Sequence, residues 1–385
     1  MTIGFASRAA VSTWVLCTAH LLATAPAVAI GGVDPGPRAT AAAPSLLYRP
    51  GTHVRPRPGA PGLPDPSARS WLVADVRTGD VLAAHDAHRR LPPASTLKTL
   101  FALTVLPALP AGIRHRVDAR ELEGVGPGSS LVGVAENRTY RVADLWNGVF
   151  LSSGNDAVHV LTALTGGLRA TTERMQAEAR ALGARDTRVK SPDGYDAPGQ
   201  VSSAFDLAVF GRAGLRNPEF ARYCARKEAF FPGRDGGSYG IVNTNRLLTG
   251  ADGVAPYRGL IGIKNGYTSD AGNTLVAAAR RGGRTLVVSV MNPRSGDGHA
   301  VYEEARSLLD WGFGAAGRVD PVGSLDALRD EPLPGPEAES AAVPVTRRDG
   351  GPGRPPSWTI AGAALLGGAG TALLLRLRWG PVPAD

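Results

Sequence analysis

Two patterns typical of β-hairpins stand far apart in this chain, and together they restrict its fold. Residues 71–76 and 81–85 flank one short turn, and residues 273–279 and 285–291 flank another, both turns containing Gly and Arg. A third strand candidate over 260–264 precedes the second hairpin. We expect these distant strands to close one antiparallel sheet, which requires the long segment between them to fold as an insertion.

Between the two hairpins the apolar residues recur at helical spacing. The pattern covers 142–149 and 175–182, and a glycine follows the second segment as a C-terminal cap. Ser203 with Asp206 resembles a capping box that opens another helix. A last helix over 302–311 is expected to pack on the sheet. The sequence therefore predicts an α+β fold, in which an antiparallel sheet is flanked by helices and carries an inserted all-helical lobe.

The first 29 residues have the layout of a secretory signal peptide. One positive charge, Arg8, precedes a largely apolar run, and small residues end the segment at Ala29. We predict cleavage after Ala29, and an uncleaved N-terminal membrane anchor is the alternative. Residues 30–66 are rich in Pro and Gly, which predicts a spacer.

A second apolar segment lies near the other end of the chain. Residues 357–375 carry no charge and are long enough for a membrane-spanning helix of about 27 Å, and arginines follow in the tail over 376–385. The positive-inside rule places this tail in the cytoplasm and the rest of the protein outside. A buried core helix is the alternative reading. With a linker over 319–356, one catalytic body remains over 67–318, held at the cell membrane.

Charge and cysteine content narrow the function further. Lys and Arg total 42 against 34 Asp and Glu, and the basic residues form no run with interleaved aromatics, so we expect no nucleic-acid partner. Of the two cysteines, Cys17 falls in the signal peptide. The mature chain then keeps only Cys224 and forms no intramolecular disulfide.

Ser95 and Lys98 stand three residues apart at a predicted helix start. Two prolines and an alanine precede Ser95, and an apolar run follows Lys98. A spacing of three puts both side chains on one helix face. A serine hydroxyl needs a base to become a nucleophile, and a desolvated neutral lysine can take its proton. The pair predicts a nucleophile with its base, although a surface Ser and Lys would show the same spacing.

Two further short motifs follow in order. Ser153-Gly154-Asn155 falls between two helical patterns, where we expect a loop, and such a tripeptide is by itself an ordinary helix cap. Lys264-Asn265-Gly266 closes the third strand candidate before Tyr267 and Thr268, and a strand-end lysine before a turn is also common. The chain has only four lysines, however, and two of them fall in these ordered motifs.

The three motifs together resemble those of the serine D-alanyl-D-alanine carboxypeptidases, the low-molecular-mass penicillin-binding proteins, which share S-x-x-K and K-T-G elements with class A β-lactamases. The resemblance covers about 67–313 and includes the segments 243–248 and 308–313. It implies the β-lactamase and penicillin-binding transpeptidase fold, a peptidoglycan stem peptide ending in D-Ala-D-Ala as substrate, β-lactams as covalent inhibitors, and no metal or organic cofactor.

The resemblance also implies a role for each motif residue. Ser95 would attack the D-Ala-D-Ala carbonyl and form an acyl-enzyme, with Lys98 as its base. Burial and the second cation, Lys264, would lower the pKa of Lys98. Ser153 would pass a proton to the departing D-Ala amine, and Asn155 would hold a substrate amide.

The strand after Lys264 would bind the substrate backbone and carboxylate. The backbone N–H groups of Ser95 and Tyr267 would form the oxyanion hole, and the strand edge through Gly266 and Thr268 would pair with the extended peptide. Asn265 stands where the family usually has threonine, whose hydroxyl helps to hold the terminal carboxylate, so carboxylate recognition is in doubt. Arg294 and His299 are candidate helpers for that carboxylate.

Other readings depend on weaker signals. Gly236 to Gly240 match the G-x-S-x-G pattern but follow a turn-like segment rather than a strand, and His159 on a predicted helix is expected to be packed or exposed. A β-lactamase is the alternative enzyme, disfavoured because no Glu-x-x-x-Asn segment lies between Asn155 and Lys264. A catalytically weak peptidoglycan-binding or scaffolding protein is a further alternative, motivated by Asn265 and the long tethers.

Overall fold

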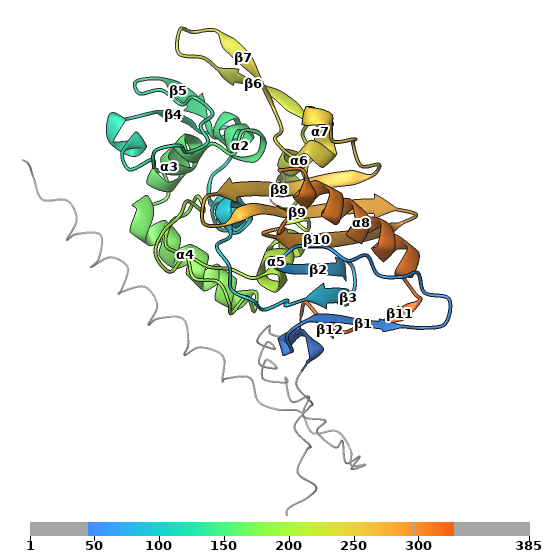
Figure 1. The fold of residues 1–385 in the computed structure, drawn as a ribbon. Coiled ribbons are helices and arrows are strands. Elements are labelled where there is room, and N and C mark those ends of the chain that lie inside the picture. The colour runs from blue at the N-terminus through green and yellow to red at the C-terminus, as the bar shows by residue number, and fades with distance from the viewer. Residues whose placement is uncertain (1–44, 296–297, 327–385) are drawn as a thin grey trace, which may run out of the picture. The chain divides into compact units, whose positions relative to one another are not determined.

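A computed structural model describes residues 45–295 and 298–326 of the chain, and these residues are built around one antiparallel sheet (Figure 1). Eight strands form it in the order β11-β1-β3-β2-β10-β9-β8, and β12 pairs with β3 beside this path. Their bounds are β1 Thr52–Pro56, β2 Ser70–Asp75, β3 Asp80–His85, β8 Leu260–Thr268, β9 Gly272–Arg281, β10 Arg284–Met291, β11 Val319–Asp320 and β12 Gly323–Ser324.

Both predicted hairpins and the third strand are confirmed. The hairpin β2–β3 joins the hairpin β9–β10 because β2 pairs with β10, with Val73 opposite Val288. The strand predicted over 260–264 continues as β8 to Thr268. Lys264 therefore lies in the middle of this edge strand, opposite Val276, and not at its end as we expected.

The sheet extends beyond the body predicted at 67–318. Within the stretch 30–66, where we expected a spacer, β1 pairs with β3 and β11, and the short helix Leu46–Tyr48 precedes β1. Leu47 is 2% exposed and packs in the core. The Pro and Gly content of this stretch gave no indication of the strand, because a strand as short as β1 needs only a few apolar anchors to join a sheet.

Helices cover both faces of the sheet, and the long insertion between β3 and β8 forms a second lobe. α8, the predicted C-terminal helix, packs on one face, whereas α1 and α5 pack on the other. The lobe is mainly helical and also contains two small two-stranded antiparallel sheets, β4–β5 and the hairpin β6–β7. The bounds are α1 Lys98–Val105, α2 Val142–Leu151, α3 Asn155–Ala163, α4 Gly167–Ala181, α5 Ala204–Gly214, α6 Pro218–Cys224, α7 Arg246–Thr249, α8 Ala300–Ala315, β4 Arg114–Arg116, β5 Thr139–Arg141, β6 Glu228–Pro232 and β7 Ser238–Val242.

The helix boundaries follow from local capping chemistry. The Ser203 side chain accepts a hydrogen bond from the Asp206 backbone N–H, so the predicted cap at the start of α5 is confirmed. After α4, Gly183 adopts a φ of 78°, the left-handed conformation in which a glycine ends a helix. The G-x-S-x-G pattern at 236–240 lies in the turn and second strand of β6–β7 and does not open a helix.

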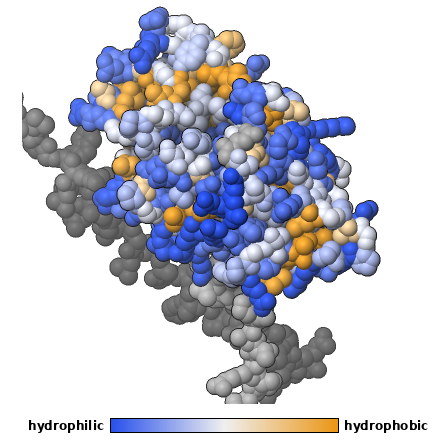
Figure 2. All heavy atoms as spheres, viewed as in Figure 1, coloured by the Kyte–Doolittle hydropathy of each residue, from blue (hydrophilic) through white to orange (hydrophobic). Residues whose placement is uncertain are grey.

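The side of the molecule seen in Figures 1 and 2 has a largely polar surface. Figure 2 shows hydrophilic residues over most of this side, with hydrophobic residues gathered in separate patches. Phe230 and Val242 of the β6–β7 hairpin are among the exposed large apolar side chains.

The predicted signal peptide over 1–29 and the membrane helix over 357–375 lie outside the described residues. Among the helices of residues 45–295 and 298–326, none combines the length and apolar character that a membrane span requires.

Candidate active site

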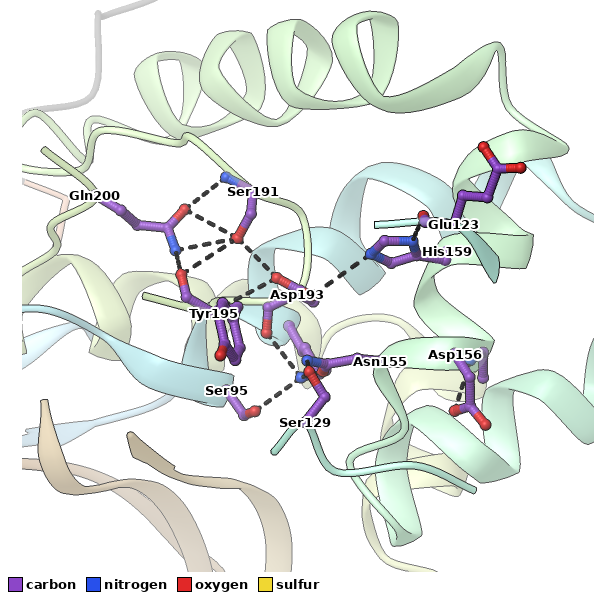
Figure 3. Close-up of polar contacts among 12 residues, drawn as sticks. Ser95, Glu123, Ser129, Asn155, Asp156, His159, Ser191, Asp193, Tyr195 and Gln200 are labelled. Carbon is purple, nitrogen blue, oxygen red and sulfur yellow. Dashed lines mark hydrogen bonds and ion pairs between the residues drawn. The ribbon is translucent and has the colours of Figure 1, made fainter. Parts of the chain in front are cut away.

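The amine of Lys98 lies at the centre of a hydrogen-bonded cluster between the two lobes. Figure 3 shows the three residues that contact this amine, Ser95, Asn155 and Asp193, lying close together. Ser95 lies in a 3₁₀ turn, Ala94–Leu97, that leads directly into α1 at Lys98. The Lys98 Nζ is 2.7 Å from each of three oxygens, Ser95 Oγ, Asn155 Oδ1 and the Asp193 carbonyl. The structure therefore brings the predicted nucleophile, its predicted base and Asn155 into direct contact.

This cluster accommodates both protonation states of the amine. The ammonium form donates to all three oxygens, whereas the neutral form can keep its two donors for the Asn155 and Asp193 oxygens and offer its lone pair to the Ser95 O–H. Lys98 is 1% exposed, and burial lowers its pKa to about 8 even though the Asp193 and Asp156 carboxylates act in the opposite direction. The amine is therefore able to accept the Ser95 proton near neutral pH.

Lys264 and Gly266 bring the edge strand β8 against the Ser95 turn. Lys264 is 1% exposed, and burial together with the nearby charge of Lys98 lowers its pKa well below its usual value. Its Nζ donates to the Asn265 carbonyl at 2.8 Å. A Cβ on Gly266 would lie 2.6 Å from the Ser95 backbone nitrogen, so only glycine permits this close approach.

Ser153 lies in the short loop between α2 and α3, as the sequence predicted, whereas Asn155 is the first residue of α3. Ser153 has a φ of 57°, an unusual backbone conformation for a non-glycine residue. Its Oγ is buried and lacks a hydrogen-bond partner among the described residues. The Asn155 amide, whose Oδ1 contacts Lys98, donates through Nδ2 to Ser129 Oγ at 3.0 Å. A buried hydroxyl without a partner is available to a bound substrate.

Two cavities lie along β8. One, of about 200 Å³, is lined by Ser95, Asn155 and Asp196 together with Tyr267 and Thr268 of the strand. The structure therefore places Tyr267 and Thr268 at the wall that holds the predicted nucleophile.

The second cavity, of about 470 Å³, is lined by Asn265, Gly266 and Tyr267 and by Arg246. Asn265 Oδ1 accepts a hydrogen bond from Thr244 Oγ1 at 3.1 Å. Because Tyr267 lines both cavities, they form two sections of one binding region along the strand edge.

For the terminal carboxylate of the substrate, the structure indicates a different candidate arginine from the one that the sequence suggested. Arg294 and His299 are absent from the described residues that line either cavity, and the Arg294 backbone N–H donates to Ser67 Oγ. Arg246 lines the second cavity, where its guanidinium pairs with Asp252 at 2.9 Å and lies over the Tyr302 ring. Arg246 falls in the segment 243–248 that resembles the family, but the sequence of this segment did not indicate where the Arg246 side chain would lie.

Asp193 is the other site residue that the sequence did not reveal. Burial alone would raise the pKa of its carboxyl, but the nearby His159 ring, the charge of Lys98 and hydrogen bonds from Ser191 and Tyr195 hold that pKa well below its usual range. His159 Nε2 lies 3.7 Å from this carboxylate (Figure 3), so His159 packs behind the site and is not in contact with Ser95. No sequence periodicity marks the loop that carries Asp193.

A serine bonded to a buried lysine, with a second buried lysine on the adjoining strand edge, defines an active-site serine enzyme of the acyl-transfer class. The sequence model of peptidase family S11, the D-alanyl-D-alanine carboxypeptidases, matches residues 58–295. The chain belongs to this family and is a serine-type D,D-carboxypeptidase, a hydrolase of the penicillin-binding protein class.

Individual relatives agree with this assignment. The D-alanyl-D-alanine carboxypeptidase DacB2 of Mycobacterium tuberculosis is 40% identical over 71% of this chain and 90% of its own length. A crystal structure of a D-alanyl-D-alanine carboxypeptidase from M. tuberculosis is similar with a TM-score of 0.63 and 39% identity, over 71% of this chain and all of that one. Penicillin-binding protein 6B of Escherichia coli is similar with a TM-score of 0.59 and 34% identity, over 68% of this chain and 81% of its own. The predicted family and fold class are confirmed.

Proposed function

We propose that this protein removes the terminal D-Ala of peptidoglycan stem peptides through an acyl-enzyme on Ser95, while anchored to the cell membrane with its catalytic body outside. The observation that carries the chemistry is the Lys98 amine, which is buried and bonded to Ser95 Oγ at 2.7 Å. A nucleophile and a neutral base in contact are what serine acyl transfer requires.

The first step forms a C–O bond between Ser95 and the substrate carbonyl carbon, giving a tetrahedral intermediate that becomes an ester when the peptide bond breaks. The Ser95 oxygen attacks the carbonyl carbon of the penultimate D-Ala as its proton moves to Lys98 Nζ. We assign the N–H groups of Ser95 and Tyr267 to stabilise the negative charge that develops on the carbonyl oxygen, because Gly266, the residue before Tyr267, packs closely against the Ser95 backbone nitrogen.

The second step breaks the peptide bond and releases D-Ala. The leaving amine takes a proton, and the buried Ser153 hydroxyl, which has no partner in the described part of the chain, is the group we assign to relay it from Lys98. The terminal carboxylate occupies the cavity lined by Asn265 and Arg246, where a guanidinium suits carboxylate binding.

The third step restores the enzyme. A water molecule takes the place of the leaving amine, and Lys98, neutral again after giving up its proton, removes a proton from this water as it attacks the ester. The C–O bond to Ser95 breaks as Lys98 returns this proton to the Ser95 oxygen, and the shortened stem peptide departs with a new carboxyl group, which ionises.

The proposed location is supported by the sequence alone. The signal-like segment 1–29 and the uncharged segment 357–375 with arginines after it are the pattern of an exported protein with one C-terminal span. Membrane fractions of cells that make the full chain should contain it, and a stop codon before residue 357 should move it to the soluble extracytoplasmic fraction. Retention in the membrane without 357–375 would contradict the C-terminal anchor.

Covalent labelling tests the chemistry. The ectodomain should release D-Ala from a peptide ending in Lys-D-Ala-D-Ala and be labelled by a fluorescent penicillin. Ser95→Ala should abolish both, whereas Ser307→Ala, an exposed serine on α8, should leave both unchanged. Persistent labelling of Ser95→Ala would refute the assigned nucleophile. Rapid hydrolysis of penicillin would favour a β-lactamase, and binding without acylation would favour a scaffolding protein.

A further inference from the structure

The cavity that contains Ser95 has one charged side chain in its lining, and the mechanism above does not use it. Twelve described residues line this cavity of about 200 Å³, and Asp196 is the only one of them that carries a charge. The position of a single carboxylate next to the nucleophile raises the question of what it binds.

The residues just before Asp196 are anchored to the active site (Figure 3). The Asp193 carbonyl accepts from Lys98 Nζ, and the Tyr195 hydroxyl donates to the Pro127 carbonyl at 2.7 Å. Gly194 has a φ of 84° and lies so close to Ala94 that a Cβ on it would be 2.0 Å from the Ala94 carbonyl oxygen. These contacts of Asp193, Gly194 and Tyr195 fix the position of Asp196 at the cavity wall.

Among the described residues, the carboxylate of Asp196 has a single, long hydrogen bond. It is partly buried, and the backbone N–H of Asp270 donates to its Oδ2 at 3.4 Å. Across residues 45–295 and 298–326, Asp196 forms no ion pair with an Arg, Lys or His side chain. A partly buried carboxylate without a cation beside it favours a positively charged ligand group.

The orientation of the substrate decides which group this is. The terminal carboxylate belongs in the cavity of Asn265 and Arg246, so the acyl part of the substrate extends from Ser95 into the cavity of Asp196. Antiparallel pairing with β8 carries the substrate backbone from Thr268 towards Asn265. The residue before the acylated D-Ala is then about 3.5 Å further along, beside Tyr267, Thr268 and Asp196.

In a stem peptide this preceding residue is a diamino acid, whose side-chain amine is free until it becomes part of a cross-link. We propose that Asp196 is a specificity-determining residue that pairs with this free ammonium group, so that the enzyme prefers stem peptides whose diamino acid is not yet cross-linked. The inference rests on the function proposed above.

Two peptides that differ only at this amine test the inference. Nα-acetyl-Lys-D-Ala-D-Ala has a free ε-amine, and Nα,Nε-diacetyl-Lys-D-Ala-D-Ala does not. The wild-type ectodomain should cleave the first with a kcat/KM about tenfold higher, as expected for one charge-assisted hydrogen bond. Asp196→Asn should lower the kcat/KM of the first peptide to that of the second, and leave the second peptide and the rate of penicillin labelling unchanged.

Asp270→Asn is the matched control, because it removes the same charge from the neighbouring exposed turn and its side chain does not line the cavity. This variant should keep the preference for the free amine. The inference is overturned if the wild type does not distinguish the peptides, if Asp196→Asn still does, or if both variants lose the preference equally. It is also overturned if Asp196→Asn slows both peptides and penicillin labelling, which would make Asp196 part of the chemistry. A wild type that releases D-Ala from neither peptide refutes the proposed function itself.

Discussion

At the scale of single residues, the protonation state of Lys98 controls the first chemical step of the proposed mechanism. Burial lowers the pKa of its amine to about 8, so at pH 7 about one molecule in ten holds the neutral base. We therefore expect the rate of acylation by penicillin to rise about tenfold between pH 6 and pH 7 and to level off above pH 8. Stopped-flow acylation of the ectodomain from pH 5.5 to 9.5 measures this. A rate that stays flat or falls across that range would contradict Lys98 as the base.

Arg246 provides a second prediction for single residues, because this arginine, rather than Arg294 or His299, lines the cavity proposed to bind the terminal carboxylate. Arg246→Gln should lower kcat/KM for a peptide with a free terminal carboxylate by about tenfold or more, mainly through KM, since a charge-assisted contact is lost. The same peptide with a C-terminal amide should be affected little. Arg294→Gln is the matched control, and an equal loss in that variant would remove the distinction between the two arginines.

At the scale of elements, the proposed oxyanion hole depends on the close approach of β8 to the Ser95 turn. A methyl group at residue 266 would lie 2.6 Å from the Ser95 nitrogen and 2.8 Å from Thr274 Oγ1, so Gly266→Ala must push the strand away. We expect acylation to slow by about a hundredfold or more, the effect of losing an oxyanion donor. Gly240→Ala in β7 is the control, because a Cβ there meets nothing within 4 Å. Normal acylation in Gly266→Ala would show that the strand spacing is not critical.

The elements that the sequence predicted are those defined by local spacing. The hairpins β2–β3 and β9–β10 and the cap at Ser203 depend on residues that are near in sequence, and they are found where expected. β1 was missed because its pairing with β3 and β11 depends on distant strands. Asp193 was missed because it contacts Lys98 through its backbone carbonyl, a group that every residue has, so the residue type gave no signal.

At the scale of the whole molecule, one buried carboxyl makes the stability of the fold depend on pH. Asp206 of α5 is fully buried, and burial raises its pKa to about 7, with the Asp186 carboxylate adding to the effect and hydrogen bonds from Thr187 opposing it. Asp206 Oδ2 accepts from the Asp186 N–H and Thr187 Oγ1, so this carboxyl ties α5 to the segment that follows α4. The native state therefore favours a protonated Asp206.

The sign of the pH effect follows from this raised pKa. Below about pH 4 the carboxyl is protonated in both states, but between about pH 4 and pH 7 only the unfolded chain loses the proton, so the free energy of unfolding falls as the pH rises. Between pH 5 and pH 8 this loss is about 3 kcal/mol at most. Asp206→Asn keeps an acceptor for Thr187 and has no proton to lose.

We therefore expect the Tm of Asp206→Asn, relative to that of the wild type, to be several degrees higher at pH 8 than at pH 5. Thermal unfolding of both proteins at the two pH values measures this difference. Asp235→Asn, in the exposed turn of the β6–β7 hairpin, controls for the loss of one negative charge and should show no such dependence. If the Tm difference between Asp206→Asn and the wild type is the same at both pH values, then Asp206 titrates alike in the native and unfolded states. The prediction that the native state holds a buried, protonated Asp206 would then be wrong.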